Sequence, residues 1–123
     1  MDWARYAGSF NATLASANTD RTFGRPLPNF QFHHQPFNYH AKFNPTQASA
    51  AAYRAKHLKD FDAQLLQDAT ARTLPAVSFS KPQGHLNRRP GYANAAEGDA
   101  YIANVIAQLP ASPQWKNMLI VVT

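Results

Sequence analysis

Two adjacent histidines, His33 and His34, are the residues of this sequence best suited to acid–base chemistry. They lie among aromatic side chains in residues 32–39, immediately before Gln35 and Pro36. An imidazole changes charge near neutral pH, so it can donate or accept a proton at a reacting group. Neither a helical nor a strand period fits this stretch, which predicts an ordered loop that presents polar groups. On residue type alone, however, a structural role for both histidines is the favoured explanation.

The composition limits the classes of function. The chain has 123 residues, of which 45% are hydrophobic and 12% aromatic; this is enough for the core of one domain and argues against disorder. The net charge of +5 suits an anionic substrate such as a phosphate ester. The basic residues are scattered, apart from Arg88 and Arg89, so we expect no specific nucleic-acid binding. The absence of cysteine excludes disulfides and cysteine-ligated zinc.

Neither a membrane span nor a signal peptide is predicted. No apolar run approaches the roughly 20 residues that cross a bilayer. Residues 1–8 lack the basic and then apolar pattern of a signal peptide.

The first half of the chain combines short regular elements with a long irregular segment. Residues 2–7 alternate polar and apolar and predict a strand, and residues 11–17 favour a helical turn. Residues 21–45 contain four prolines and six aromatics, which predicts an irregular but ordered segment. A helix should run from Thr46 to about Leu58, with its alanine-rich stripe facing the core.

A second helix is expected from about Asp60 to Thr70, with one apolar face directed at the core. That face consists of Phe61, Leu65 and Ala69. The carboxylates on this helix have the spacing of solvated groups; they are Asp60, Asp62 and Asp68.

The second half of the chain predicts an α/β fold. Residues 74–79 form an apolar run typical of a buried strand, and residues 81–92 form a loop with two prolines and two glycines. A third helix should start near Asp99 and end at Pro110; its predicted buried stripe is Ile102, Val105, Ile106 and Leu109. Ser112 should cap a short helix, and residues 118–123 read as a central parallel strand. Together these elements predict a βαβ unit over residues 77–122.

Several stretches in combination resemble one protein family. They are DWARYAG at 2–8, HHQPFNY at 33–39, HLKD at 57–60, LPAVSF at 74–79 with KPQG at 81–84, PGY at 90–92 and SPQWK at 112–116. This combination resembles the bacterial phosphoesterase family of acid phosphatases and phosphatidylcholine-type phospholipases C, within the alkaline-phosphatase-like superfamily. The resemblance covers essentially the whole chain in order.

The resemblance implies hydrolysis of phosphate esters by a divalent metal ion and a Ser or Thr nucleophile. It also implies a partial α/β/α sandwich with a mostly parallel sheet. Family members are longer: their nucleophile and first metal ligands lie before the part matched here, and a second acidic pair follows the strand that resembles residues 118–123. The resemblance therefore implies that residues 1–123 are a single partial domain, an internal piece that binds no metal alone. Full-length members are typically exported.

The resemblance also assigns site residues. His33 and His34 match the family's paired histidines and are the candidate catalytic residues. Asn87 matches an asparagine of the family's Asn-x-His-Pro-Gly segment, and Arg89 stands where that segment has its histidine. Arginine can bind a phosphate through two donors, but it stays protonated and cannot act as an acid or base. Lys81 flanks the same loop; substrate binding and a solvated surface role are equally compatible with its position.

Three functions remain open from the sequence. The chain is a piece of a metal-dependent phosphoesterase, a non-catalytic remnant that binds anions, or, ranked last, a basic nucleic-acid-binding module. Since we identify no carboxylate set for a metal, we expect no hydrolysis of p-nitrophenyl phosphate by the chain alone. A parallel sheet without all its strands also predicts marginal stability and self-association through exposed strand edges.

Overall fold

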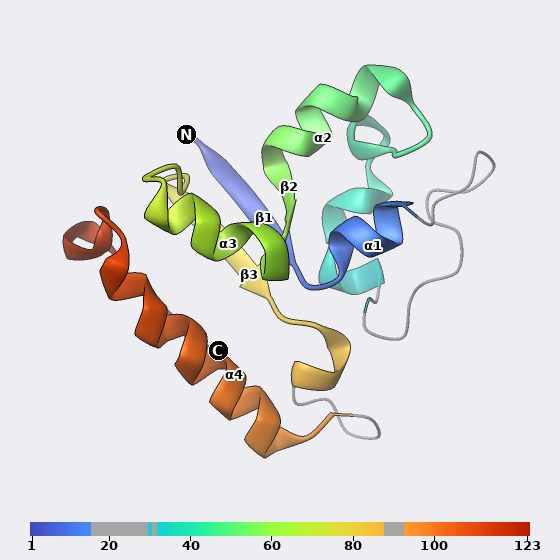
Figure 1. Ribbon diagram of the computed structural model, residues 1–123. Coiled ribbons are helices and arrows are strands. Elements are labelled where there is room, and N and C mark those ends of the chain that lie inside the picture. Colours follow the sequence, from blue (N-terminus) through green and yellow to red (C-terminus); the bar gives the residue numbers. More distant parts are fainter. Residues whose placement is uncertain (16–29, 31, 88–92) are drawn as a thin grey trace.

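Three parallel strands form the centre of the computed structural model (Figure 1), which describes residues 1–15, 30, 32–87 and 93–123. The strands are β1 (Trp3–Ala7), β2 (Leu58–Asp60) and β3 (Val77–Lys81), in the order β2-β1-β3. Arg5, in the middle of β1, is opposite Leu58 on one side and Phe79 on the other. The α/β fold class and the strand predicted over residues 2–7 are confirmed.

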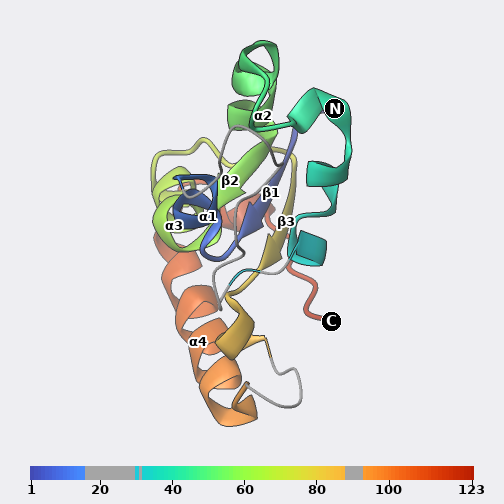
Figure 2. The ribbon, with the colours of Figure 1, turned by 90° about the vertical axis from the view of Figure 1, so that its right-hand side faces the viewer.

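The helices lie on both faces of this sheet (Figure 2). The α-helices are α1 (Phe10–Ala15), α2 (Ala51–His57), α3 (Phe61–Thr70) and α4 (Ala95–Gln108). Short 3-10 helices connect them: η1 (Phe32–His34), η2 (Pro36–Tyr39), η3 (Ala41–Phe43), η4 (Ala48–Ala50), η5 (Gly84–Leu86), η6 (Leu109–Ala111) and η7 (Trp115–Asn117). In the described part of the chain, no helix is both long and apolar enough to cross a membrane.

One face of the sheet packs against α3 and α4. Because side chains alternate along a strand, Ala4 and Tyr6 of β1 both point to this face, where they are fully buried. They pack with Phe61 and Leu65 of α3 and Val105 of α4. The predicted core face of α3 is confirmed, since Phe61, Leu65 and Ala69 are all buried. On the predicted stripe of α4 and η6, Val105 and Leu109 are buried and the two isoleucines are half-buried.

The opposite face is covered by α1, α2 and the 3-10 helices between them in the chain. Its core consists of Ala7, Phe10, Phe30, Phe43 and Leu58. Trp3 of β1 extends this core, because its ring lies 4.7 Å from that of Phe37 and is stacked at 4.4 Å on that of His57. Phe37 and Phe43, from the described part of the long irregular segment, therefore pack on the sheet beside Trp3.

Side-chain caps fix where two of the helices begin. Asp60 caps α3 by accepting a hydrogen bond from Ala63 N at 3.0 Å. Asn94 caps α4 by accepting from Ala96 N at 2.9 Å. As a result α4 begins at Ala95, before the predicted start near Asp99.

The helix predicted from Thr46 to Leu58 is shorter, and its alanine stripe does not face the core. Helix α2 ends at His57, and Leu58 begins β2, a strand that the sequence did not indicate. The stripe alanines are exposed; they are Ala48, Ala51, Ala52 and Ala55. An alanine buries little apolar area, so α2 is held instead by the larger rings of Tyr53 and His57, which contact Phe43 and Trp3.

Two predictions for the second half of the chain are wrong. The strand predicted as buried over residues 74–79 is β3, which starts at Val77 and lies at the sheet edge with Phe79 48% exposed. Residues 118–123 form no strand, and Leu119 is 89% exposed. A high strand propensity is realised only where a neighbouring strand supplies hydrogen bonds. The predicted βαβ unit over residues 77–122 is therefore not formed within the described residues.

Candidate active site

The structure brings together two predicted site residues that are 53 positions apart in the chain. Asn87 Nδ2 lies 3.0 Å from His34 Nε2. His34 ends η1 and is only 1% exposed, whereas Asn87 follows η5 in the segment that leaves the carboxyl end of β3. An amide nitrogen can only donate, so in this arrangement Nε2 of the imidazole accepts and is unprotonated. Open α/β sheets bind their ligands beyond the carboxyl ends of the strands, which is where this contact forms.

The backbone of His34 is held by Arg5 of the central strand. Arg5 Nε and Nη2 both donate to the His34 carbonyl oxygen, at 3.1 and 2.9 Å. In the reverse direction, Gln35 Nε2 lies 3.4 Å from the Arg5 carbonyl oxygen, to which it donates weakly. Burial lowers the pKa of Arg5, but a guanidinium keeps its charge. The histidine pair is thus connected to β1 at a residue that pairs with strands on both sides.

The two histidines have different environments. The ring of His33 is exposed, while that of His34 is buried, and the two rings meet edge to face at 4.7 Å. A substrate approaching from solvent can therefore contact the imidazole of His33 directly. The buried ring of His34 contacts Asn87 and the ring of His33 rather than bulk solvent.

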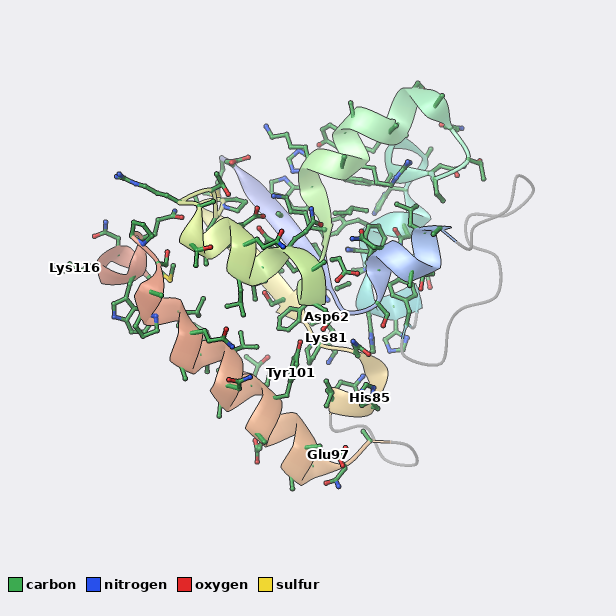
Figure 3. The ribbon with its side chains drawn as sticks, viewed as in Figure 1. Asp62, Lys81, His85, Glu97, Tyr101 and Lys116 are labelled. Carbon is green, nitrogen blue, oxygen red and sulfur yellow. The ribbon has the colours of Figure 1, made fainter. Side chains whose placement is uncertain are left out.

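Lys81 ends β3 and His85 lies in η5 shortly after it; Figure 3 labels both, together with Asp62 and Tyr101. Lys81 is the last residue of β3 and is half-buried, and its carbonyl oxygen accepts from Gly8 N at 2.9 Å. Its position at the carboxyl end of β3 is compatible with the predicted substrate contact. Arg89, the other predicted cation, lies outside the described residues.

Asp62, in the first turn of α3, connects the turn after β1, the segment after β3 and helix α4. Its Oδ2 accepts from Ser9 N at 3.1 Å and from Gln83 Nε2 at 2.9 Å, and its Oδ1 accepts from the Tyr101 hydroxyl at 2.7 Å. Burial, and then this hydrogen bond, raises the pKa of Tyr101. Although Asp62 is exposed, as predicted, its carboxylate is occupied by protein donors.

The prediction that Asp60 and Asp68 are solvated groups on helix faces is wrong. Asp60 is 4% exposed, and its Oδ2 accepts from Asn11 N at 2.8 Å. The half-buried Asp68 accepts from the Tyr6 hydroxyl at 2.6 Å and from Lys59 Nζ at 2.5 Å. Helix spacing alone could not show these contacts, because the donors Tyr6, Asn11 and Lys59 belong to β1, α1 and β2. Only the position of Asp60 directly before the helix signalled its capping role.

The described residues do not by themselves fit a divalent metal. Among them, no three histidine, aspartate or glutamate side chains are grouped as metal ligands. The carboxylates nearest the carboxyl edge, Asp60 and Asp62, are already acceptors for backbone and side-chain donors. We therefore derive no step through a metal from these residues.

Comparison with known protein families gives a match over the whole chain. A sequence model described as "Phosphoesterase family" matches residues 1–123, the whole chain. No curated protein and no solved structure matches.

Proposed function

Because the chain belongs to the Phosphoesterase family, we propose that it supplies the substrate-facing residues of a metal-dependent phosphoesterase of the acid phosphatase or phospholipase C type. The family relates the chain to phosphoester hydrolysis and implies a phosphate-ester substrate. The observation that carries the finer proposal is the 3.0 Å contact between His34 and Asn87. It joins the loop of the histidine pair to the loop after β3, two segments that both resemble the family's site.

The exposed imidazole of His33 is assigned the direct contact with the phosphate ester. When protonated, it can donate to a non-bridging oxygen; as a general acid, it can protonate the leaving alkoxide. His34 contacts the Asn87 amide through its ring at 3.0 Å and thereby orients this side chain, which is assigned a place beside the phosphate ester.

Cations complete the proposed substrate contacts. The ammonium group of Lys81 stands at the carboxyl end of β3, and the net charge of +5 favours an anionic ligand. Arg89 is assigned a charge-stabilising contact, since a guanidinium can bind two phosphate oxygens but cannot exchange protons. The proposal assigns the nucleophile and the metal ligands to parts of the enzyme other than these residues.

Binding to inorganic phosphate tests the proposal on the purified chain. We expect phosphate to shift the NMR signals of His33, Asn87 and Lys81, and His33→Ala to weaken binding. His40→Ala is the matched control, because His40 is an exposed histidine outside this constellation. A chain whose spectrum does not respond to millimolar phosphate would refute the assignment.

A turnover assay separates the substrate-facing role from a complete enzyme. The purified chain should not release p-nitrophenol from p-nitrophenyl phosphate, with or without added divalent metal. Robust metal-dependent turnover would overturn the assignment of the metal ligands to other parts of the enzyme. Phosphate binding without turnover is expected both for the substrate-facing part of an enzyme and for the alternative, an anion-binding protein.

A further inference from the structure

The guanidinium of Arg5 connects the central strand to the histidine pair. We propose that Arg5 is a positioning residue: by binding the His34 carbonyl oxygen with two donors, it holds the His34 ring against Asn87 and sets the direction of His33. The inference rests on the proposed function for its link to substrate, but the contact with Asn87 can be tested independently.

Arg5 is well placed to fix the histidine pair. It lies in the middle strand and pairs with Leu58 of β2 and Phe79 of β3, so its backbone is restrained on both sides. Its Nε and Nη2 reach the same oxygen at 3.1 and 2.9 Å. Two donors from one planar group define both the distance and the orientation of the acceptor, which a single donor does not.

Placing a charged side chain at this partly buried position costs desolvation free energy, which only hydrogen bonds or ion pairs offset. Arg5 lies between Trp3 and Ala7 on the face of β1 that packs against an aromatic core. An apolar residue could fill the same position without the cost of desolvating a guanidinium. What the guanidinium adds is a fixed partner for a backbone carbonyl of the candidate site.

His34 transmits this restraint to the loop after β3. Its carbonyl oxygen binds Arg5, while its buried ring binds Asn87 at 3.0 Å. Since η1 is a single turn, a shift of this carbonyl also moves the ring of His34 and the neighbouring ring of His33. The position of Asn87 therefore depends on Arg5, although the two residues have no direct hydrogen bond in the structure.

Three variants test the inference. Arg5→Gln removes the pair of donors, and Arg5→Lys keeps the charge with one compact donor group. Arg54→Gln is the matched control: Arg54 is also half-buried and its Nη1 donates to a backbone carbonyl, that of Asn44, at 2.9 Å. All three need a measured free energy of unfolding, so that loss of stability is separated from loss of position.

The readouts are the imidazole nitrogen signals of His34 and the side-chain amide protons of Asn87. In Arg5→Gln we expect these signals to move toward those of unbonded groups, in Arg5→Lys to lie between, and in Arg54→Gln to match wild type. We also expect Arg5→Gln to weaken phosphate binding roughly tenfold, because misplacement of site groups by about 1 Å has large effects.

The outcomes separate the inference from the proposed function. Unchanged His34 and Asn87 signals in Arg5→Gln, or equal changes in Arg54→Gln, would overturn the positioning role. If Arg5→Gln does not fold, the same comparison between Arg5→Lys and Arg54→Gln decides. If wild type does not bind phosphate but the signals move as expected, the proposed function fails while the control of Asn87 by Arg5 stands.

Discussion

The adjacent histidines His33 and His34 have different surroundings in the structure. His33 and His34 are adjacent and identical, yet one ring is exposed and the other is buried against Asn87. The difference arises because adjacent side chains of the 3-10 helix η1 point in different directions. Arg5 holds the carbonyl group of His34 in place. The two positions should therefore respond differently to mutation.

We predict that His34→Ala destabilises the fold and that His33→Ala does not. Removing the buried ring leaves a cavity and removes the contact with the Asn87 amide, at a cost of about 2–4 kcal/mol. Removing the exposed ring should change the free energy of unfolding by less than about 0.5 kcal/mol. Urea unfolding followed by circular dichroism measures both, and equal losses in the two variants would contradict the different roles.

A second prediction concerns Asp68 and the acid limit of stability. Burial alone would raise the pKa of Asp68, but hydrogen bonds from Lys59 and Tyr6 outweigh it and hold the pKa below its ordinary value of 3.8. The carboxylate therefore contributes stability that is fully present above pH 3.8 and is lost as the pH falls through the lowered value. Wild type should lose stability steeply in this range.

Asp68→Asn tests this contribution. We expect it to lower stability at pH 7 by about 1.5–3 kcal/mol, since it removes hydrogen bonds to a charged acceptor, and to flatten the decline below pH 4. Asp2→Asn is the control, because Asp2 forms an exposed ion pair with Lys56 at 3.6 Å and should contribute little. An acid decline in Asp68→Asn as steep as that of wild type would contradict the assignment.

At the residue level, the sequence did not indicate the contacts that support the candidate site, and the roles of its residues stay a prediction. The family resemblance pointed to His34 and Asn87, which do meet. Arg5 was part of the matched motif but gave no signal of its role, because an arginine in a strand says nothing about which carbonyl it will reach. Asp60 and Asp68 were misread for the same reason: their donors lie on elements distant in sequence.

At the level of elements, the turn after β1 is the tightest junction near the site. A Cβ built on Gly8 would lie 2.3 Å from Gln83 N, a backbone atom that cannot move alone. The next residue, Ser9, has φ 60°, in the left-handed region that favours glycine. The turn thus requires close approach at one position and an unusual backbone angle at the next.

We predict that substitutions at these two positions change the free energy of unfolding by different amounts. Gly8→Ala should destabilise the fold by about 1–3 kcal/mol, because the loop of Gln83 must shift to admit the methyl group. Ser9→Gly should change stability by less than about 1 kcal/mol, since relief of the left-handed angle offsets the greater freedom of the unfolded chain. Thermal unfolding measures both, and a Gly8→Ala variant as stable as wild type would contradict the packing described here.

Elements with strong local signals were predicted, and those that depend on a partner were not. The face of α3 and the strand β1 follow from periodicity in the sequence. The strand β2 has only three residues and directly continues a helical pattern, so its pairing with β1 has no local signature. Residues 118–123 have a strong strand signal in the sequence, but no described strand pairs with them.

At the scale of the molecule, the predicted self-association remains a prediction with a defined surface. The outer edge of β3 pairs with no described strand, and the exposed apolar run over residues 119–122 is uncharged. The apolar run of one copy can add as a strand to the open β3 edge of a second copy. We therefore expect the apparent mass in light scattering to rise with protein concentration.

Charges placed on the apolar run should oppose this association. The double variant Leu119→Lys and Val121→Lys should remain monomeric at concentrations where wild type associates. Ala52→Lys with Ala55→Lys adds the same charge to exposed positions of α2 and should associate like wild type. A wild type that stays monomeric and unfolds cooperatively at high concentration would contradict the prediction.

The position of β1 at the centre of the sheet also determines when the sheet can form during synthesis. Trp3 is synthesised 74 residues before its partner Val77. At typical elongation rates of about 5–20 residues per second, β1 waits roughly 4–15 s before its sheet can form. During this interval Tyr6 and Trp3 are available to other nascent chains and to chaperones. The rate of translation across residues 8–76 should therefore affect how much of the protein reaches the folded state.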